Sequence, residues 1–151
     1  MGSLASLGIT ITVIMFLGIV QKIKSTTYPI SSRFRKTWDL LINENRIIER
    51  EGDTIAILGV ENWGGKGRFP KYGDLASAYQ GTENQKVKLL LSHDPSHWRG
   101  EVTKNYKDID VTFSGHTHGM QFGIEVGQIK WSPVKYFYPE WADLYREEEQ
   151  M

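Results

Sequence analysis

Hydrophobic residues occur along the chain as one long run followed by several short ones. Residues 4–20 carry no charge, whereas residues 54–60 (TIAILGV), 87–92 (VKLLLS) and 110–114 (DVTFS) are short and apolar. Short apolar runs bounded by turn residues predict buried β-strands. The spacing of the three short runs therefore predicts a sheet built from strands far apart in the sequence.

The segments between these runs predict the remaining elements. Residues 38–48 predict a short helix that runs into a strand, and residues 74–79 predict a short helix capped by its first residue, an aspartate. Residues 122–131 alternate around a glycine and predict a β-hairpin. A proline at position 139 predicts the start of a last helix over residues 139–149. The elements together predict a mixed α/β (α+β) fold.

Residues 61–73 hold four glycines and a proline, too many for a regular element. The segment matches neither the nucleotide P-loop nor the dinucleotide-binding fingerprint. Two interpretations remain for it, a plain surface loop and the rim of an active site.

The N-terminal run predicts a transmembrane helix over residues 1–21. Its 17 uncharged residues, 4–20, span about 25 Å as a helix, at the short end of what crosses a bilayer. A signal sequence and a soluble helix are the alternatives. A signal sequence normally begins with basic residues, whereas here the basic residues follow the run.

Charge changes abruptly after this run. Residues 22–37 hold five basic side chains and no acidic one, so they are interpreted as a basic linker, and residues 37–151 carry 13 basic against 18 acidic side chains. Basic residues beside a membrane helix favour the cytoplasmic side, so we expect a single-pass membrane protein with its C-terminal part in the cytoplasm. The overall formal charge of zero gives no reason to predict a nucleic-acid partner.

The candidate chemistry lies in the histidines. The chain has no cysteine and four histidines, all between positions 93 and 118 and all just after predicted strands. Open α/β sheets build sites beyond the carboxyl ends of their strands, and a neutral imidazole is a good ligand for first-row metals. Because thiolates are excluded, we expect imidazole, carboxylate, amide or carbonyl groups to bind a metal here.

Two segments carry a resemblance to a known family. Residues 114–121 (SGHTHGMQ) resemble the Gly-His-x-His motif of the calcineurin-like metallophosphoesterases, and residues 92–95 (SHDP) resemble the single-histidine motif that precedes it. The similarity extends over residues 38–141 and is greatest to bacterial, membrane-anchored members. It identifies residues 38–151 as the C-terminal half of such a domain.

The resemblance implies a four-layer α-β-β-α sandwich that hydrolyses phosphate esters with a metal-bound hydroxide at a two-metal site. It implies that His93 and His116 ligate one divalent ion (Mn, Fe, Zn or Mg) and that His118 ligates the other. It also implies that Asp94 orients His93 without touching the metal. His97 has no role in the family pattern and is interpreted as structural.

The first half of the family pattern is missing. No Asp-x-His, Gly-Asp-x-x-Asp or Gly-Asn-His motif occurs in the sequence. The resemblance therefore implies a truncated domain, a partial sandwich whose metal site lacks several ligands.

Three functions remain open from the sequence. The first is a membrane-anchored phosphoesterase, weak or inactive alone. The second is a non-catalytic remnant that binds metal weakly or not at all. The third is an interaction module whose exposed half-sheet pairs with a complementary half-domain or with a second copy, because unpaired strand edges invite association.

Overall fold

The computed structural model describes residues 39–65, 70–118, 122–127 and 129–151. The predicted transmembrane helix and basic linker lie outside these residues. In the part of the chain that is described, no helix has the length and apolar character needed to cross a bilayer.

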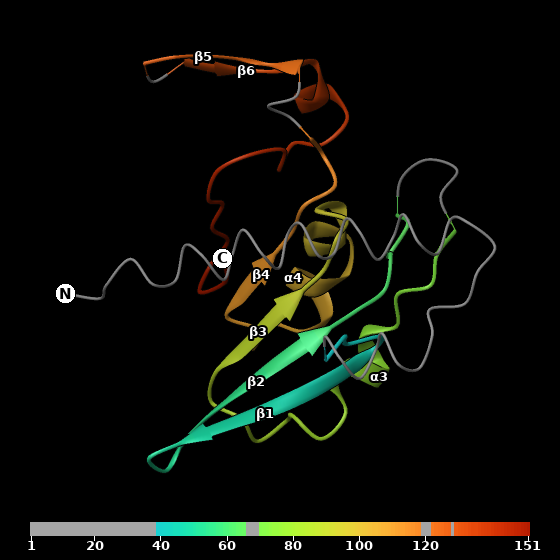
Figure 1. The fold of residues 1–151 in the computed structure, drawn as a ribbon, viewed down its shortest axis with the longest axis vertical. Helices are drawn as coiled ribbons and strands as arrows, with labels where there is room; N and C mark the ends of the chain where they lie inside the picture. The colour runs from blue at the N-terminus through green and yellow to red at the C-terminus, as the bar shows by residue number, and fades with distance from the viewer. Residues whose placement is uncertain (1–38, 66–69, 119–121, 128) are drawn as a thin grey trace.

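A four-stranded mixed sheet forms the body of the molecule (Figure 1). Its strands are β1 (Glu44–Arg50), β2 (Asp53–Gly59), β3 (Lys88–Leu91) and β4 (Val111–Phe113), in the spatial order β1-β2-β3-β4. β1 and β2 are antiparallel, whereas β2, β3 and β4 run parallel to one another. The mixed α/β class and the three strands predicted at residues 54–60, 87–92 and 110–114 are confirmed.

The described helices are short. α3 (Leu75–Tyr79), the π-helix η1 (Trp98–Val102) and α4 (Thr103–Asn105) belong to the body, whereas the 3-10 helix η3 (Pro133–Tyr136) follows the last strand of the chain and buries no residue. The predicted cap of α3 is confirmed, since Asp74 accepts a hydrogen bond from the Ser77 backbone N–H at 3.0 Å. Neither η1 nor α4 was predicted from the sequence.

One face of the sheet packs against α3 and η1. Ala56, Leu58 and Leu90 from β2 and β3 are fully buried, and the rest of the core is supplied largely by α3, η1 and the chain around them: Val60, Leu75, Ala78, Trp98, Val102 and Ile109. The opposite face carries apolar residues too, of which Ile55 is 39% exposed. Sheets containing parallel strands usually have both faces covered, so this second face is unusually open.

The predicted hairpin is confirmed. β5 (Ile124–Val126) and β6 (Ile129–Trp131) pair antiparallel around Gly127, whose positive φ of 60° suits a glycine in a tight turn. Figure 1 shows this two-stranded hairpin standing apart from the four-stranded sheet.

Two predicted helices are absent. In residues 38–48 the strand predicted to follow a short helix is confirmed as β1, which pairs along its whole length with β2, whereas the described residues ahead of it, 39–43, are not helical. Residues 139–149 do not form a helix, and Asp143 and Glu148 have positive φ values of 74° and 53° that interrupt one.

The C-terminal segment is instead held residue by residue against the body. The Gln150 side chain donates to the backbone carbonyls of Tyr106 and Ile109 at 2.9 Å. The backbone N–H of Met151 donates to Asp110, and the N–H of Thr112 donates to Met151, so the end of the chain lies along β4. These long-range bonds replace the local bonds of a helix.

Candidate metal centre

His93 and His116 follow neighbouring parallel strands. β3 ends at Leu91 and β4 at Phe113, and these two residues are paired in the sheet. Pairing continues beyond the strands, because Ser92 N–H donates to the Phe113 carbonyl at 3.0 Å and Gly115 N–H donates to the His93 carbonyl at 3.1 Å. Both histidines therefore emerge at the carboxyl edge of the sheet.

The two imidazoles meet at this edge. His93 Nε2 and His116 Nδ1 lie 3.1 Å apart, within hydrogen-bonding distance, and the rings are nearly perpendicular with centroids 5.0 Å apart. His116 has a positive φ of 67°, a conformation that non-glycine residues adopt rarely and that often marks functional loops. His116 Nε2 lies 3.0 Å from the Tyr138 hydroxyl, so three side chains form a row.

Burial keeps both imidazoles neutral. His93 is 7% exposed, and burial, followed by the neighbouring His116, lowers its pKa to about 4. Burial is also the main cause of the lowered pKa of His116. The neutral form is the one that ligates metals. Among the described residues no hydrogen-bond partner reaches the buried Nδ1 of His93, which leaves a lone pair or a proton of that ring unsatisfied.

His118 is exposed and has a positive φ of 49°. After burial, which is the largest cause, electrostatic interaction with His118 also contributes to the lowered pKa of both His93 and His116, so His118 lies within electrostatic range of the pair. Across the described ranges, no group of three histidine, aspartate or glutamate side chains could hold a metal ion. The structure thus brings two of the three predicted ligands together, and the assignment of all three stays a prediction.

The residues present fit part of a metal site. Two neutral imidazoles at one strand edge, one with an unsatisfied buried nitrogen, match the ligand type that first-row metals prefer. A catalytic zinc site ordinarily has three protein ligands, and the described residues do not assemble a third. The donor set is therefore incomplete.

Asp94 organises the backbone beside His93. Its Oδ1 accepts from the Ser96 backbone N–H at 2.9 Å and from the Ser96 hydroxyl at 2.6 Å, and its Oδ2 accepts from Gly65 N–H at 3.2 Å. Its negative charge raises the pKa of His93 against the larger effect of burial. That Asp94 orients the His93 ring stays a prediction.

His97 lies in a separate buried network. Its Nδ1 lies 2.8 Å from the Ser92 hydroxyl and its Nε2 lies 2.9 Å from Glu101 Oε2. A hydrolase triad also joins a serine, a histidine and a carboxylate, but there the serine contacts Nε2 and the carboxylate contacts Nδ1. Here the two ring nitrogens are exchanged, and Ser92 and His97 are fully buried. Because no substrate reaches them, we assign the network a structural role.

Trp63 connects the glycine-rich segment to this network. This role of Trp63 was not predicted from the sequence. Its indole Nε1 donates to Glu101 at 2.9 Å and its ring stacks on His97 with centroids 5.1 Å apart. Together with the bond from Gly65 to Asp94, this brings the segment beside the residue that follows His93. A large aromatic residue directly followed by two glycines was the available signal.

Tyr138 was also missed, and no sequence signal identifies it. It comes after η3 and reaches His116 only because the chain folds back. Burial raises the pKa of the Tyr138 hydroxyl, so it stays protonated at neutral pH and is able to donate to an imidazole nitrogen.

Compared with protein-family models, with curated proteins and with solved structures, the chain matches none of them.

Proposed function

We propose that the chain is the C-terminal half of a calcineurin-like metallophosphoesterase domain, a partial four-layer sandwich anchored to a membrane. The observation that carries the proposal is the contact between His93 Nε2 and His116 Nδ1 at the carboxyl edge of two paired parallel strands. The Ser-His-Asp-Pro and Gly-His-Thr-His segments that resemble the family supply these two residues.

The open second face of the sheet supports the half-domain. Residues that alternate with the core positions of β2 and β3 are also apolar, among them Ile57, Leu89 and Leu91, which are half-buried. A sheet with apolar residues on both faces is built to be covered on both. In the proposed sandwich a second sheet would cover this face.

In this proposal His93 and His116 hold one divalent ion and His118 holds a second. Such ions, when bound, lower the pKa of a coordinated water and neutralise charge on a phosphate ester. The chain's own contribution is to hold two imidazoles neutral and fixed, with Tyr138 beside His116 and Asp94 anchoring the loop next to His93.

We expect the chain alone to bind at most one ion weakly. Two unit charges 4 Å apart interact by about 4 kcal/mol at an effective dielectric constant of 20, and two dications by about four times as much. Complete sites offset this repulsion with carboxylates, and the family motifs that supply them are missing here. Hydrolysis of phosphodiesters should therefore stay near background.

Calorimetric titration of the full chain with Mn²⁺ or Zn²⁺ tests the site. We expect one weak binding event that His116→Ala weakens at least about tenfold, whereas Tyr138→Phe, which keeps both imidazoles, still binds. Absence of binding, or equal binding by the His116→Ala chain, would contradict the metal centre.

A chromogenic phosphodiester assayed with added Mn²⁺ tests the half-site argument. We expect turnover at background for the chain and for its His116→Ala variant. Metal-dependent turnover that the substitution abolishes would show that further ligands complete the site.

A non-catalytic interaction module is the second candidate, favoured by the exposed apolar residues of the sheet, such as Ile48 at 51% and Ile55 at 39% exposure. It predicts self-association, or capture of a complementary half-domain, without any requirement for metal. Sedimentation of the chain with and without a chelator distinguishes the two candidates.

A further inference from the structure

The β5–β6 hairpin has one fully apolar face. Ile124 pairs with Trp131 and Val126 pairs with Ile129, so these four side chains share one side of the two strands. We call them the hairpin face. The intervening pair is Glu125 and Lys130, and it occupies the other side.

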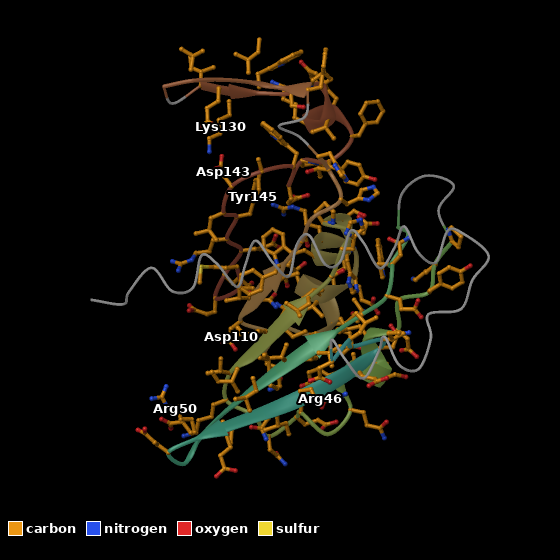
Figure 2. The ribbon with its side chains drawn as sticks, viewed as in Figure 1. Arg46, Arg50, Asp110, Lys130, Asp143 and Tyr145 are labelled. Carbon is orange, nitrogen blue, oxygen red and sulfur yellow. The ribbon has the colours of Figure 1, made fainter. Side chains whose placement is uncertain are left out.

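The hairpin face points away from the body of the molecule. Lys130 forms an ion pair with Asp143 of the C-terminal segment, and Figure 2 shows these two side chains directed toward one another across the gap below the hairpin. Because successive side chains of a strand point to opposite faces, the residues that alternate with Lys130 are directed outward.

The outward residues are strongly exposed. Val126 is 68% and Ile129 72% exposed. Aromatic residues that precede β5 or follow β6, and so belong to the open end of the hairpin, are exposed as well: Phe122, Tyr136 and Phe137, each at least 70%. Soluble monomers rarely expose a contiguous apolar surface of this kind. A two-stranded hairpin is also barely stable without a partner for its apolar side.

The chemistry of this surface suits a lipid bilayer. Aliphatic residues lie next to the turn, aromatic residues lie toward the other end, and no acidic side chain shares the hairpin face. Aromatic side chains are enriched at the level of lipid headgroups, where an apolar ring and a polar edge are both satisfied. Lys135 in η3 adds a cation beside them.

The chain that precedes the described residues points to the same partner. It contains the uncharged run 4–20, predicted to span a membrane, followed by the basic residues of segment 22–37. The 17 residues between this run and residue 38 (21–37) can span at most about 60 Å, the length of a fully extended chain. Such a tether would keep the body within reach of the bilayer, and basic segments favour anionic lipid surfaces.

We propose that the hairpin face inserts into the boundary between headgroups and acyl chains of the membrane that carries the chain. Interfacial apolar elements of this kind bury themselves about 5–10 Å below the headgroup surface. Docking would give the body a second point of attachment and fix its orientation on the bilayer. The proposal rests on the membrane anchor of the proposed function, and it does not require metal or catalysis.

The absence of cysteine from the sequence allows a site-specific test. The full chain carrying Val126→Cys, and a matched chain carrying Glu125→Cys, are labelled with an environment-sensitive fluorophore and reconstituted into phosphatidylcholine–phosphatidylglycerol vesicles. The two positions are adjacent in β5 and face opposite sides of the hairpin. Emission is then recorded with nitroxide-labelled lipids and with aqueous iodide as quenchers.

We expect a blue shift at position 126 and quenching by the nitroxide lipids about threefold stronger than at position 125, as a burial depth of 5–10 Å implies. Iodide should show the reverse preference. Equal quenching at the two positions, or no association with vesicles, overturns the proposal. A blue shift at 126 without lipid quenching, together with energy transfer between copies labelled there, overturns it in favour of a dimer.

Discussion

At the residue scale, the most informative side chains are histidines that the fold keeps uncharged. His93, His97 and His116 each have a lowered pKa, and burial is the largest cause in all three. Glu101 raises the pKa of His97, so the burial effect exceeds the attraction of a carboxylate 2.9 Å away. The native state therefore favours neutral rings, and protonation works against it.

These pKa values predict a loss of stability in acid. Between the ordinary value of 6.5 and the folded value of about 4 for His93, the unfolded chain binds a proton that the folded chain does not. The contribution of the neutral His93 ring to the free energy of unfolding is therefore fully present above pH 6.5, and it is lost as the pH drops through this window. For His93 alone the loss is about 2 kcal/mol, once partial contact of the ring with water is allowed for.

Urea unfolding at pH 7.5 and pH 4.5 measures this loss. The chain carrying His93→Asn should lose less of its free energy of unfolding between the two pH values than the parent chain does. The same pH dependence in both chains would assign the effect to other groups.

At the scale of elements, Trp63 attaches the glycine-rich segment to η1. The Trp63 ring stacks on His97, the residue directly before η1, and its indole N–H donates to Glu101, which lies within η1. The indole lies so close to this helix that a Cβ built at Gly100 would lie 2.2 Å from its ring. Glycine at position 100 is thus required by the close approach of the tryptophan.

Gly100→Ala should destabilise the chain by about 1–3 kcal/mol, because the added methyl group overpacks the contact with Trp63. In a Trp63→Ala background the same substitution should be neutral or stabilising by up to about 1 kcal/mol, since alanine favours helix over glycine. A double-mutant cycle from denaturant unfolding measures the coupling. An equal cost in both backgrounds would mean that the backbone of η1, rather than Trp63, requires glycine.

At the scale of the whole molecule, two apolar surfaces remain open in the described part of the chain. One is the second face of the four-stranded sheet and the other is the hairpin face. The charges are distributed differently, with acidic side chains in excess over residues 37–151 and basic ones concentrated in residues 22–37. The open apolar surfaces of the described residues and the basic composition of residues 22–37 both agree with the proposed attachment to a membrane.

We expect the full chain to remain in the membrane pellet after an alkaline carbonate wash, which removes peripheral proteins. A charge placed in the centre of the run, Met15→Lys, should shift the chain toward the supernatant, because lysine at the middle of a membrane helix costs about 2.5–3.5 kcal/mol. Ser25→Lys adds the same charge outside the run and should leave the distribution unchanged. Recovery of the parent chain in the supernatant would exclude the membrane helix.

The sequence by itself determined the features that depend on near neighbours. The strands β2, β3 and β4, the Asp74 cap and the hairpin around Gly127 were predictable because their apolar periods and turn residues are local. The meeting of His93 with His116 followed from the same pattern, since each residue comes just after one of two strands expected to be neighbours.

Only the tertiary structure decided the features that depend on distant partners. β1 extends over residues 44–50 because β2 offers it a full ladder, and the C-terminal segment is not a helix because Arg99, Tyr106 and β4 bind its residues one by one. Trp63 and Tyr138 likewise reach the histidines from 34 and 22 positions away along the chain. Local propensities differ by less than about 1 kcal/mol per residue, so long-range pairing and burial outweigh them wherever the folded chain supplies both.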